Sequence, residues 1–92
     1  MTSRSVTIRN QLGMHARAAA RFVRTASAFT SQVWVAHGEK VMDGKSILGI
    51  LLLAAGRGSS LTISADGRDE LAAVNELVAL VDSGFGEFPC NG

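Results

Sequence analysis

Two side chains near the start of a helical pattern have the types and the spacing to do chemistry. In "GMHARAAARFVRTAS", residues 13–27, His15 stands two residues before Arg17. A helix N-terminus binds anions, because its first backbone N–H groups lack helical partners and carry the positive end of the macrodipole. A guanidinium can hold two phosphate oxygens with parallel hydrogen bonds. The pattern therefore favours a phosphoryl group carried on the His15 imidazole and steadied by Arg17. The backbone N–H groups expected to contact it are those of Ala16, Arg17 and Ala18.

The alternative interpretation of His15 is structural. A lone histidine before a helix is more often an N-cap or a surface imidazole without chemistry. Gly13, which permits a sharp turn before the helix, and Arg17 favour the chemical interpretation. A carrier must also release its phosphate, so we expect His15 to be exposed at the rim of the domain. We expect no separate enzymatic activity, because no second catalytic group stands near His15 in the sequence.

The remaining candidate metal ligands do not form a pattern. His37 lies at a predicted hairpin turn, where we expect it to be solvated. His15, His37 and the single cysteine, Cys90, lack the spacing typical of metal ligands. We therefore predict no metal site and no cofactor.

Ser46 precedes the apolar run "ILGILLLAA", residues 47–55. A serine in this position is typical of a helix N-cap, whose hydroxyl accepts a hydrogen bond from an early backbone N–H group. The run has more apolar residues than one side of a short surface helix needs. Ile50 and Leu53 can face the core together. A helix buried all round is the alternative, but a two-layer domain of this size hardly provides it. We expect an exposed patch for partner docking, formed by Ile47, Leu48 and Leu51.

Hydrophobic periodicity predicts an alternation of strands and helices. The strands are expected at residues 5–9, on both sides of a His37–Gly38 turn within 31–44, and at 61–65. The helices are expected at 16–27, at 46–55 where "GRG" at 56–58 ends the run, and from about 71 to 83. Ala16, Ala19, Ala20, Val23 and Ala26 share one side of the first helix, with Phe22 beside them, and Leu71 and Val74 begin the apolar side of the last. The order βαββαβα predicts an α+β fold with an antiparallel sheet and helices on one face.

Composition limits the class of protein. The 92 residues are expected to form one domain, with its core at about 5–87 and a short loose tail at 88–92. A net charge of +1 and the absence of tyrosine argue against nucleic-acid binding. The longest apolar run is about half of a membrane span, and the first residues lack the apolar core of a signal peptide. The single cysteine fits a reducing compartment, so we expect a cytoplasmic protein without membrane insertion.

Two motifs in this chain resemble those of one known family. "GMHARAAARFV" resembles the active-site signature of the histidine-containing phosphocarrier (HPr) family of the bacterial phosphoenolpyruvate-dependent phosphotransferase system. "MDGKSILGILLLAAGRG", residues 42–58, resembles the family's second motif, around a regulatory serine. The resemblance extends from about Ser5 to Glu87. It implies an open-faced β-sandwich with strand order 1-4-2-3 and three helices on one face.

The resemblance also implies a function. His15 would accept phosphate on Nδ1 from enzyme I and pass it to a histidine of an enzyme IIA-type protein, while Arg17 steadies the phosphoryl group. A serine kinase and phosphatase would act on Ser46. The protein would be a monomeric phosphoryl carrier, not an enzyme.

One departure concerns the branch of the family. Members devoted to sugar uptake often have proline where this chain has Ala18. The chain is in this respect closer to the nitrogen-related branch, called NPr. The alternative function is therefore a regulatory protein of the nitrogen-related system that acts through partner binding rather than sugar transport. The presence of both His15 and Arg17 argues against a regulator that has lost phosphate transfer.

Overall fold

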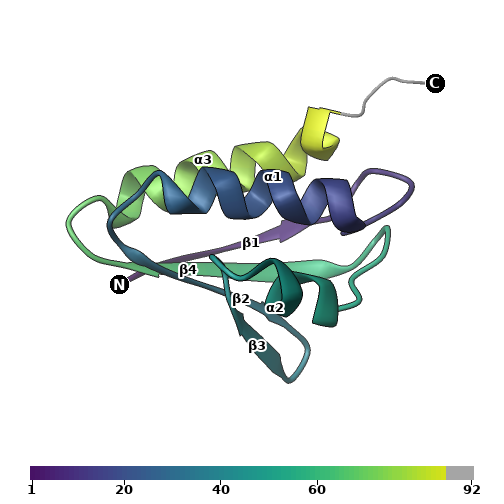
Figure 1. Cartoon of the computed structure of the whole chain (residues 1–92), viewed down its shortest axis with the longest axis horizontal. Coiled ribbons are helices and arrows are strands. Elements are labelled where there is room, and N and C mark those ends of the chain that lie inside the picture. Colours follow the sequence, from purple (N-terminus) through teal and green to yellow (C-terminus); the bar gives the residue numbers. More distant parts are fainter. Residues whose placement is uncertain (87–92) are drawn as a thin grey trace.

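The computed structural model describes residues 1–86 and shows a twisted sheet with helices packed along it (Figure 1). The strands are β1 (Thr2–Thr7), β2 (Gln32–His37), β3 (Lys40–Asp43) and β4 (Ser60–Asp66). The helices are α1 (Ala16–Ser27), α2 (Ile47–Leu52) and α3 (Glu70–Asp82), followed by a short 3₁₀ turn, η1 (Gly84–Gly86). The predicted order βαββαβα is confirmed. The expected tail at 88–92 and the end of the expected core lie outside the described residues.

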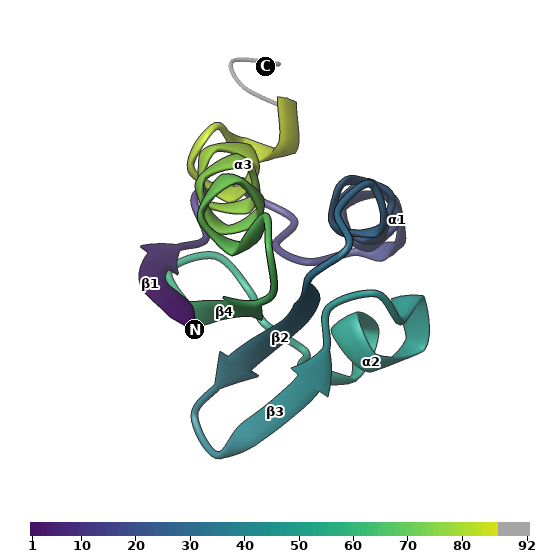
Figure 2. The same cartoon turned by 90° about the vertical axis from the view of Figure 1, so that its left-hand side faces the viewer.

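All strand pairs are antiparallel, and the strand order is β1-β4-β2-β3. The register places Val6 opposite Leu61 and Val35 opposite Ile63, so that apolar residues line the same face. Helices α1, α2 and α3 lie on the same side of the sheet, and the other side is left uncovered by residues 1–86 (Figure 2). The predicted fold, an α+β open-faced sandwich, is confirmed. No helix within residues 1–86 has the length and apolar character needed to cross a bilayer.

The alternation of residue types decides which face of the sheet is covered. Val33, Val35 and Ile63 are buried beneath the helices. The opposite face carries polar side chains, and the hydroxyls of Ser3 and Ser64 lie 2.7 Å apart across β1 and β4. Trp34 points to this open face and is partly exposed, as its position between two core valines predicts.

Helix α1 has the predicted bounds, and the side that faces the core overlaps the predicted one at Ala19 and Ala26. Its buried residues are Ala18, Ala19, Phe22 and Ala26. Phe22 is the largest apolar side chain of the helix, and its neighbours at spacings of three and four share its side. Ala16 is therefore exposed. The expected role of Leu71 in the apolar side of α3 is also wrong, because 62% of this residue is exposed.

Helix α2 is shorter than predicted. It ends at Leu52, where residues 46–55 were expected to be helical. Ala54 has a left-handed backbone conformation, with φ of +52°, and this turns the chain out of the helix before Gly56. The prediction that "GRG" at 56–58 ends the helix is therefore wrong. β1 also begins earlier than predicted, at Thr2.

Candidate functional site

The loop before α1 begins with a tight turn from Asn10 to Gly13. The backbone N–H of Gly13 donates to the Asn10 carbonyl at 3.2 Å, and the buried Asn10 side chain donates to the Gly13 carbonyl at 2.8 Å. Gly13 has φ of +67°, and a Cβ on this residue would lie 2.7 Å from the Ala55 carbonyl oxygen. Glycine alone satisfies both the conformation and the space.

The His15 loop is attached to the segment that follows α2. The N–H of Met14 donates to the Ala55 carbonyl at 2.9 Å, and the Met14 side chain is buried. The N–H of His15 in turn donates to the Gly13 carbonyl at 3.0 Å. No local pattern in the sequence indicates that Asn10, Met14 and Ala55 contribute to the site. Only the glycine before His15 gave a sign of this close packing.

His15 is the N-cap of α1. Its backbone is extended, with φ of −78° and ψ of 179°, and its carbonyl accepts the first helical hydrogen bond from Ala19 at 2.8 Å. Its Nδ1 atom accepts a hydrogen bond from the N–H of Arg17 at 3.2 Å. Nδ1 therefore presents its lone pair to the first turn of the helix. The same geometry therefore serves both interpretations of His15: the side chain caps the helix, and its imidazole is aimed at the anion-binding helix end.

The exposure of the site agrees in part with expectation. His15 is half-buried rather than fully exposed, while Ala16 and Arg17 are exposed and Ala18 is buried. Within residues 1–86, the Arg17 guanidinium makes no hydrogen bond or ion pair with another residue, whereas Arg21 donates to the Phe85 carbonyl at 2.9 Å. The first turn of α1 has no acidic residue. The helix end therefore keeps its positive character.

Ser46 is the N-cap of α2, as predicted. Its backbone is extended, and its hydroxyl oxygen accepts a hydrogen bond from the N–H of Gly49 at 3.0 Å. Its carbonyl accepts from Ile50 at the same distance, 3.0 Å. Ser46 is half-buried, so its hydroxyl is at the boundary between solvent and the helix end.

Helix α2 presents a large apolar surface to solvent. Ile50 and Leu53 face the core, as predicted. The residues expected to be exposed are exposed, and Leu52 joins them. We call this set the α2 patch; its members and their exposed fractions are Ile47 (46%), Leu48 (68%), Leu51 (36%) and Leu52 (53%). Four neighbouring apolar side chains exposed on one short helix are typical of an interaction surface.

The expectation that His37 is solvated is wrong. His37 is half-buried, and its Nδ1 atom lies 3.1 Å from the Leu53 carbonyl oxygen, just after α2. The hairpin turn itself is at Gly38, so the His37 side chain is directed back toward α2. Within residues 1–86, no three side chains of the metal-ligating types lie together.

Two carboxylates tie strand ends to the start of α3, at the end of the molecule away from the start of α1 (Figure 1). Asp69 accepts hydrogen bonds from the Ser31 hydroxyl and from the N–H groups of Thr30, at 2.9 Å, and Ser31, at 3.0 Å. The Ser31 hydroxyl makes the largest contribution to lowering the pKa of Asp69 to about 2. The Thr2 hydroxyl, at 2.6 Å, likewise lowers the pKa of Glu70 to about 2. These contacts hold the fold rather than the site.

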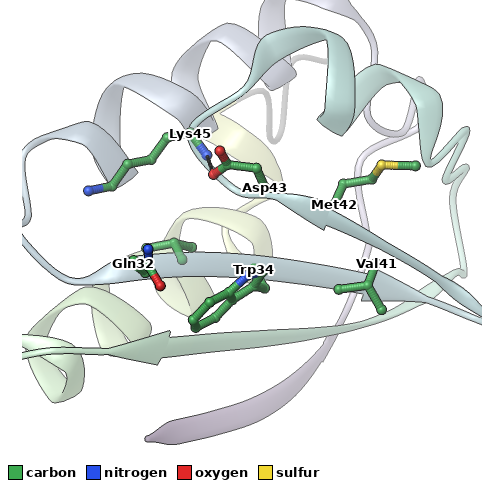
Figure 3. A pocket seen from close by; sticks show the side chains of 7 residues that line it. Gln32, Trp34, Val41, Met42, Asp43 and Lys45 are labelled. Carbon is green, nitrogen blue, oxygen red and sulfur yellow. Dashed lines mark hydrogen bonds between the residues drawn. The ribbon is translucent and has the colours of Figure 1, made fainter.

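A shallow depression of about 580 Å³ lies along the β2–β3 hairpin. Figure 3 shows Trp34 and Val41 on its wall and the Asp43 carboxylate that accepts the Lys45 N–H, at 2.9 Å. None of the residues with candidate chemistry lines it. His15, the half-buried N-cap of α1, lies outside this depression.

Comparison with known proteins agrees with this geometry. The sequence model of a family described as "PTS HPr component phosphorylation site" matches residues 2–83. The chain belongs to the HPr family. It is 44% identical to the phosphocarrier protein HPr of Neisseria meningitidis over 87 residues, which cover 95% of this chain and 98% of that protein.

The family includes relatives of both branches. The HPr-family chain is 43% identical over 84 residues to the phosphocarrier protein NPr of Shewanella violacea, covering 91% of this chain and 92% of that protein. Its structure is similar to the crystal structure of HPr from Thermoanaerobacter tengcongensis, with a TM-score of 0.91 and 46% identity over 95% of this chain and 98% of that chain. The role as a phosphocarrier of the phosphotransferase system is thereby supported. The relatives do not distinguish the two branches.

Proposed function

We propose that this protein accepts a phosphoryl group on His15 Nδ1 from enzyme I and passes it to a histidine of an enzyme IIA-type protein. The observation that carries the proposal is that Nδ1 accepts a hydrogen bond from the N–H of Arg17 at the start of α1. In each step, the bond from phosphorus to the donor histidine nitrogen breaks as the bond to the acceptor nitrogen forms. The relay operates in the cytoplasm.

The first step requires that Nδ1 leave its cap hydrogen bond. At 3.2 Å this bond is at the long end of the range for N–H donors, so a small rotation of the imidazole suffices to aim the lone pair at an incoming phosphorus atom. The phosphoryl oxygens then replace Nδ1 as acceptors at the helix end. The donors are the N–H groups of Ala16, Arg17 and Ala18, together with the Arg17 guanidinium.

The partners complete the site. Phosphoryl transfer depends mainly on in-line positioning and on stabilisation of charge. A rim with one arginine and one helix end holds phosphate loosely enough for release to the next acceptor. The α2 patch gives both partners an apolar surface close to α1, since α1 and α2 pack against each other (Figure 2). Enzyme I and the IIA-type acceptor therefore dock on the same face in turn.

Ser46 is the proposed site of regulation by a serine kinase and phosphatase. A phosphate on this N-cap would be stabilised by the N-terminal end of α2, and it would place about −1.5 to −2 charges beside the α2 patch. A partner that covers the patch must then oppose or desolvate that charge. Phosphorylation of Ser46 would therefore weaken docking without unfolding the helix.

The nitrogen-related branch is the alternative function. Ala18 stands where sugar-uptake members often have proline, and the Shewanella violacea NPr protein is 43% identical. In that branch, the same phosphate cycle reports on nitrogen metabolism through partner binding, and no sugar is moved. Enzyme I and IIA proteins of the two branches, offered separately, would distinguish the alternatives by the rate of transfer.

Incubation with enzyme I and labelled phosphoenolpyruvate tests the proposal. We expect one label per chain that is lost in acid and retained in base, as for a phosphohistidine. The label should transfer to an enzyme IIA protein when that is added. Acid-stable label, or none, would contradict the proposed function.

A further inference from the structure

The turn that ends α2 is held from the β2–β3 hairpin by two side chains. The last carbonyls of a helix have no donors within the helix. Here Lys40 Nζ donates to the Leu52 carbonyl at 3.3 Å, and His37 Nδ1 lies 3.1 Å from the Leu53 carbonyl oxygen. A carbonyl oxygen can only accept, so His37 carries its proton on Nδ1. The two histidines therefore use Nδ1 in opposite ways: His15 accepts and His37 donates.

Ala54, which follows Leu53, has a backbone conformation that needs support from the residues around the turn. Ala54 has φ of +52°, a region that L-residues with a side chain rarely adopt. Such a conformation persists only where the surrounding structure holds it. The Ala54 N–H donates to the Leu51 carbonyl at 3.0 Å, and the His37 hydrogen bond fixes the carbonyl that precedes Ala54. His37 is thus placed to hold the backbone in this conformation.

The same turn is hydrogen-bonded to the loop that precedes His15. The Ala55 carbonyl accepts the N–H of Met14 at 2.9 Å. Gly13 lies so close that a Cβ on it would be 2.7 Å from the Ala55 oxygen and from the Gly56 α-carbon. A displacement of Ala55 would therefore displace Met14, which is bonded directly to His15.

We propose that His37 is a positioning residue for phosphoryl transfer at His15. Its Nδ1–H group fixes the turn Leu53–Ala55, and this turn fixes the loop that aims His15 at the start of α1. The path is short, because the carbonyl that His37 contacts, that of Leu53, and the carbonyl that Met14 contacts, that of Ala55, are only two residues apart. The effect on transfer rests on the proposed function, whereas the effect on the loop is measurable without any partner.

Two variants of the full chain separate the hydrogen bond from the packing of the ring. His37→Leu keeps an apolar side chain but removes the donor. His37→Asn places an amide N–H near the position of Nδ1, because both nitrogens are attached to Cγ. The measurements are hydrogen exchange of the Met14 amide, the rate of phosphorylation of His15 by enzyme I, and unfolding in urea.

We expect His37→Leu to exchange the Met14 amide about tenfold faster and to slow phosphorylation about tenfold, as for one lost hydrogen bond. His37→Asn should restore both to near the parent values. Unchanged Met14 exchange in His37→Leu would overturn the proposal. Equal losses in both variants would also overturn it, because ring packing rather than the donor would then be responsible.

A measurement on the parent protein keeps the test decisive if His37→Leu unfolds. Nitrogen-15 spectra of the imidazoles distinguish the two tautomers. We expect the proton of neutral His37 on Nδ1, and a proton on Nε2 would overturn the proposal. If enzyme I transfers no phosphate even to the parent protein, the proposed function fails, while the Met14 exchange and the tautomer still decide whether His37 positions the loop.

Discussion

The N-termini of α1 and α2 have the same local design but different surroundings. Each is capped by a side chain that can carry a phosphoryl group, His15 for α1 and Ser46 for α2, and each cap accepts one early N–H of its helix. α1 has 12 residues, four of them buried, whereas α2 has six residues, of which Ile50 alone is buried. The two ends therefore differ in what supports them rather than in how they are capped.

The proposed function gives the two ends different roles, and their surroundings fit those roles. The start of α1 has an exposed guanidinium beside it and a loop fixed by backbone hydrogen bonds to Ala55 and Asn10. A phosphoryl group there is stabilised yet accessible. The start of α2 adjoins the α2 patch and has no acidic residue in its first turn, and the ammonium of the preceding Lys45 donates to the Phe29 carbonyl at 2.8 Å. A phosphate on Ser46 would chiefly alter what can dock. Under the proposed function, the position of each end within the fold, and not its cap, would separate the carrier site from the regulatory site.

The largest effect on transfer is expected from the cap of α1. His15→Ala should abolish labelling by enzyme I, because no other imidazole lies at this helix end. The fold should remain, since loss of an N-cap hydrogen bond costs about 1 kcal/mol. Circular dichroism provides the control for folding. Full labelling of His15→Ala would show that the phosphoryl group is not carried at the start of α1.

Arg17 should have the next largest effect. Arg17→Ala removes a charged hydrogen-bond donor from the phosphoryl group, and we expect transfer to slow about 10- to 100-fold. Arg17→Lys should restore part of the rate, because lysine lacks the planar fork of donors. Arg24→Ala on the same helix is the matched control and should transfer nearly as fast as the parent. Equal rates for Arg17→Ala and the parent would show that the guanidinium has no role at the site.

A charged side chain introduced into the α2 patch tests whether enzyme I docks there. Leu48→Asp should weaken binding of enzyme I about tenfold or more, the effect of losing one buried leucine at an interface. Leu71→Asp is the matched control, because Leu71 is equally exposed on α3 but lies outside the patch. Calorimetric titration gives the affinities, and thermal melting gives the stabilities. Equal weakening by both substitutions would argue for a general charge effect rather than a docking surface.

Ser46 should affect stability and transfer separately. Ser46→Ala removes the cap and should cost about 0.5–2 kcal/mol, whereas Ser46→Asp keeps an acceptor that the helix end favours. Transfer from enzyme I should nevertheless be severalfold slower for Ser46→Asp than for Ser46→Ala. Melting temperatures and transfer rates for both variants provide the comparison. Identical transfer rates would leave Ser46 as a helix cap alone.

The start of α3 offers a third case, with the smallest expected effect on transfer. Asp69 stands at its N-cap position but bonds Thr30 and Ser31 instead of the helix. Because the folded-state pKa is depressed to about 2, its stabilising contribution is present above its ordinary pKa near 4 and is lost as the pH falls toward 2. Asp69→Asn should reduce that part of the acid dependence of unfolding and leave transfer at pH 7 unchanged. A slowed transfer would mean that this end of the molecule communicates with His15.

The sequence predicted the elements and the caps because both depend on local signals. Ser46 before an apolar run and His15 before an alanine-rich helix determine caps through residues only two or three positions away. The order of the strands followed from the family resemblance. Prediction of the last turn of α2 failed, because Ala54 is left-handed and its neighbours Leu53 and Ala55 contact His37 of β2 and Met14, which lie far away in the sequence.

Side-chain surroundings were harder to predict for the same reason. His37 was expected in solvent from its place beside a hairpin glycine, yet the hairpin folds back to place its ring against the Leu53 carbonyl. The attachment of Met14 to Ala55 joins segments about forty residues apart, and no local pattern encodes it. Only the packing of the whole chain brings the end of α2 to the start of α1.

The central claim is that the phosphoryl group is held on His15 Nδ1 by the start of α1. Nuclear magnetic resonance of the nitrogen-15-labelled protein, phosphorylated by enzyme I, tests it in one experiment. The account predicts phosphorus coupling to Nδ1 and large downfield shifts of the amide protons of Ala16, Arg17 and Ala18, with the Gly49 amide at the start of α2 unchanged. Phosphorus on Nε2, or amides of the first turn of α1 that do not move, would contradict it.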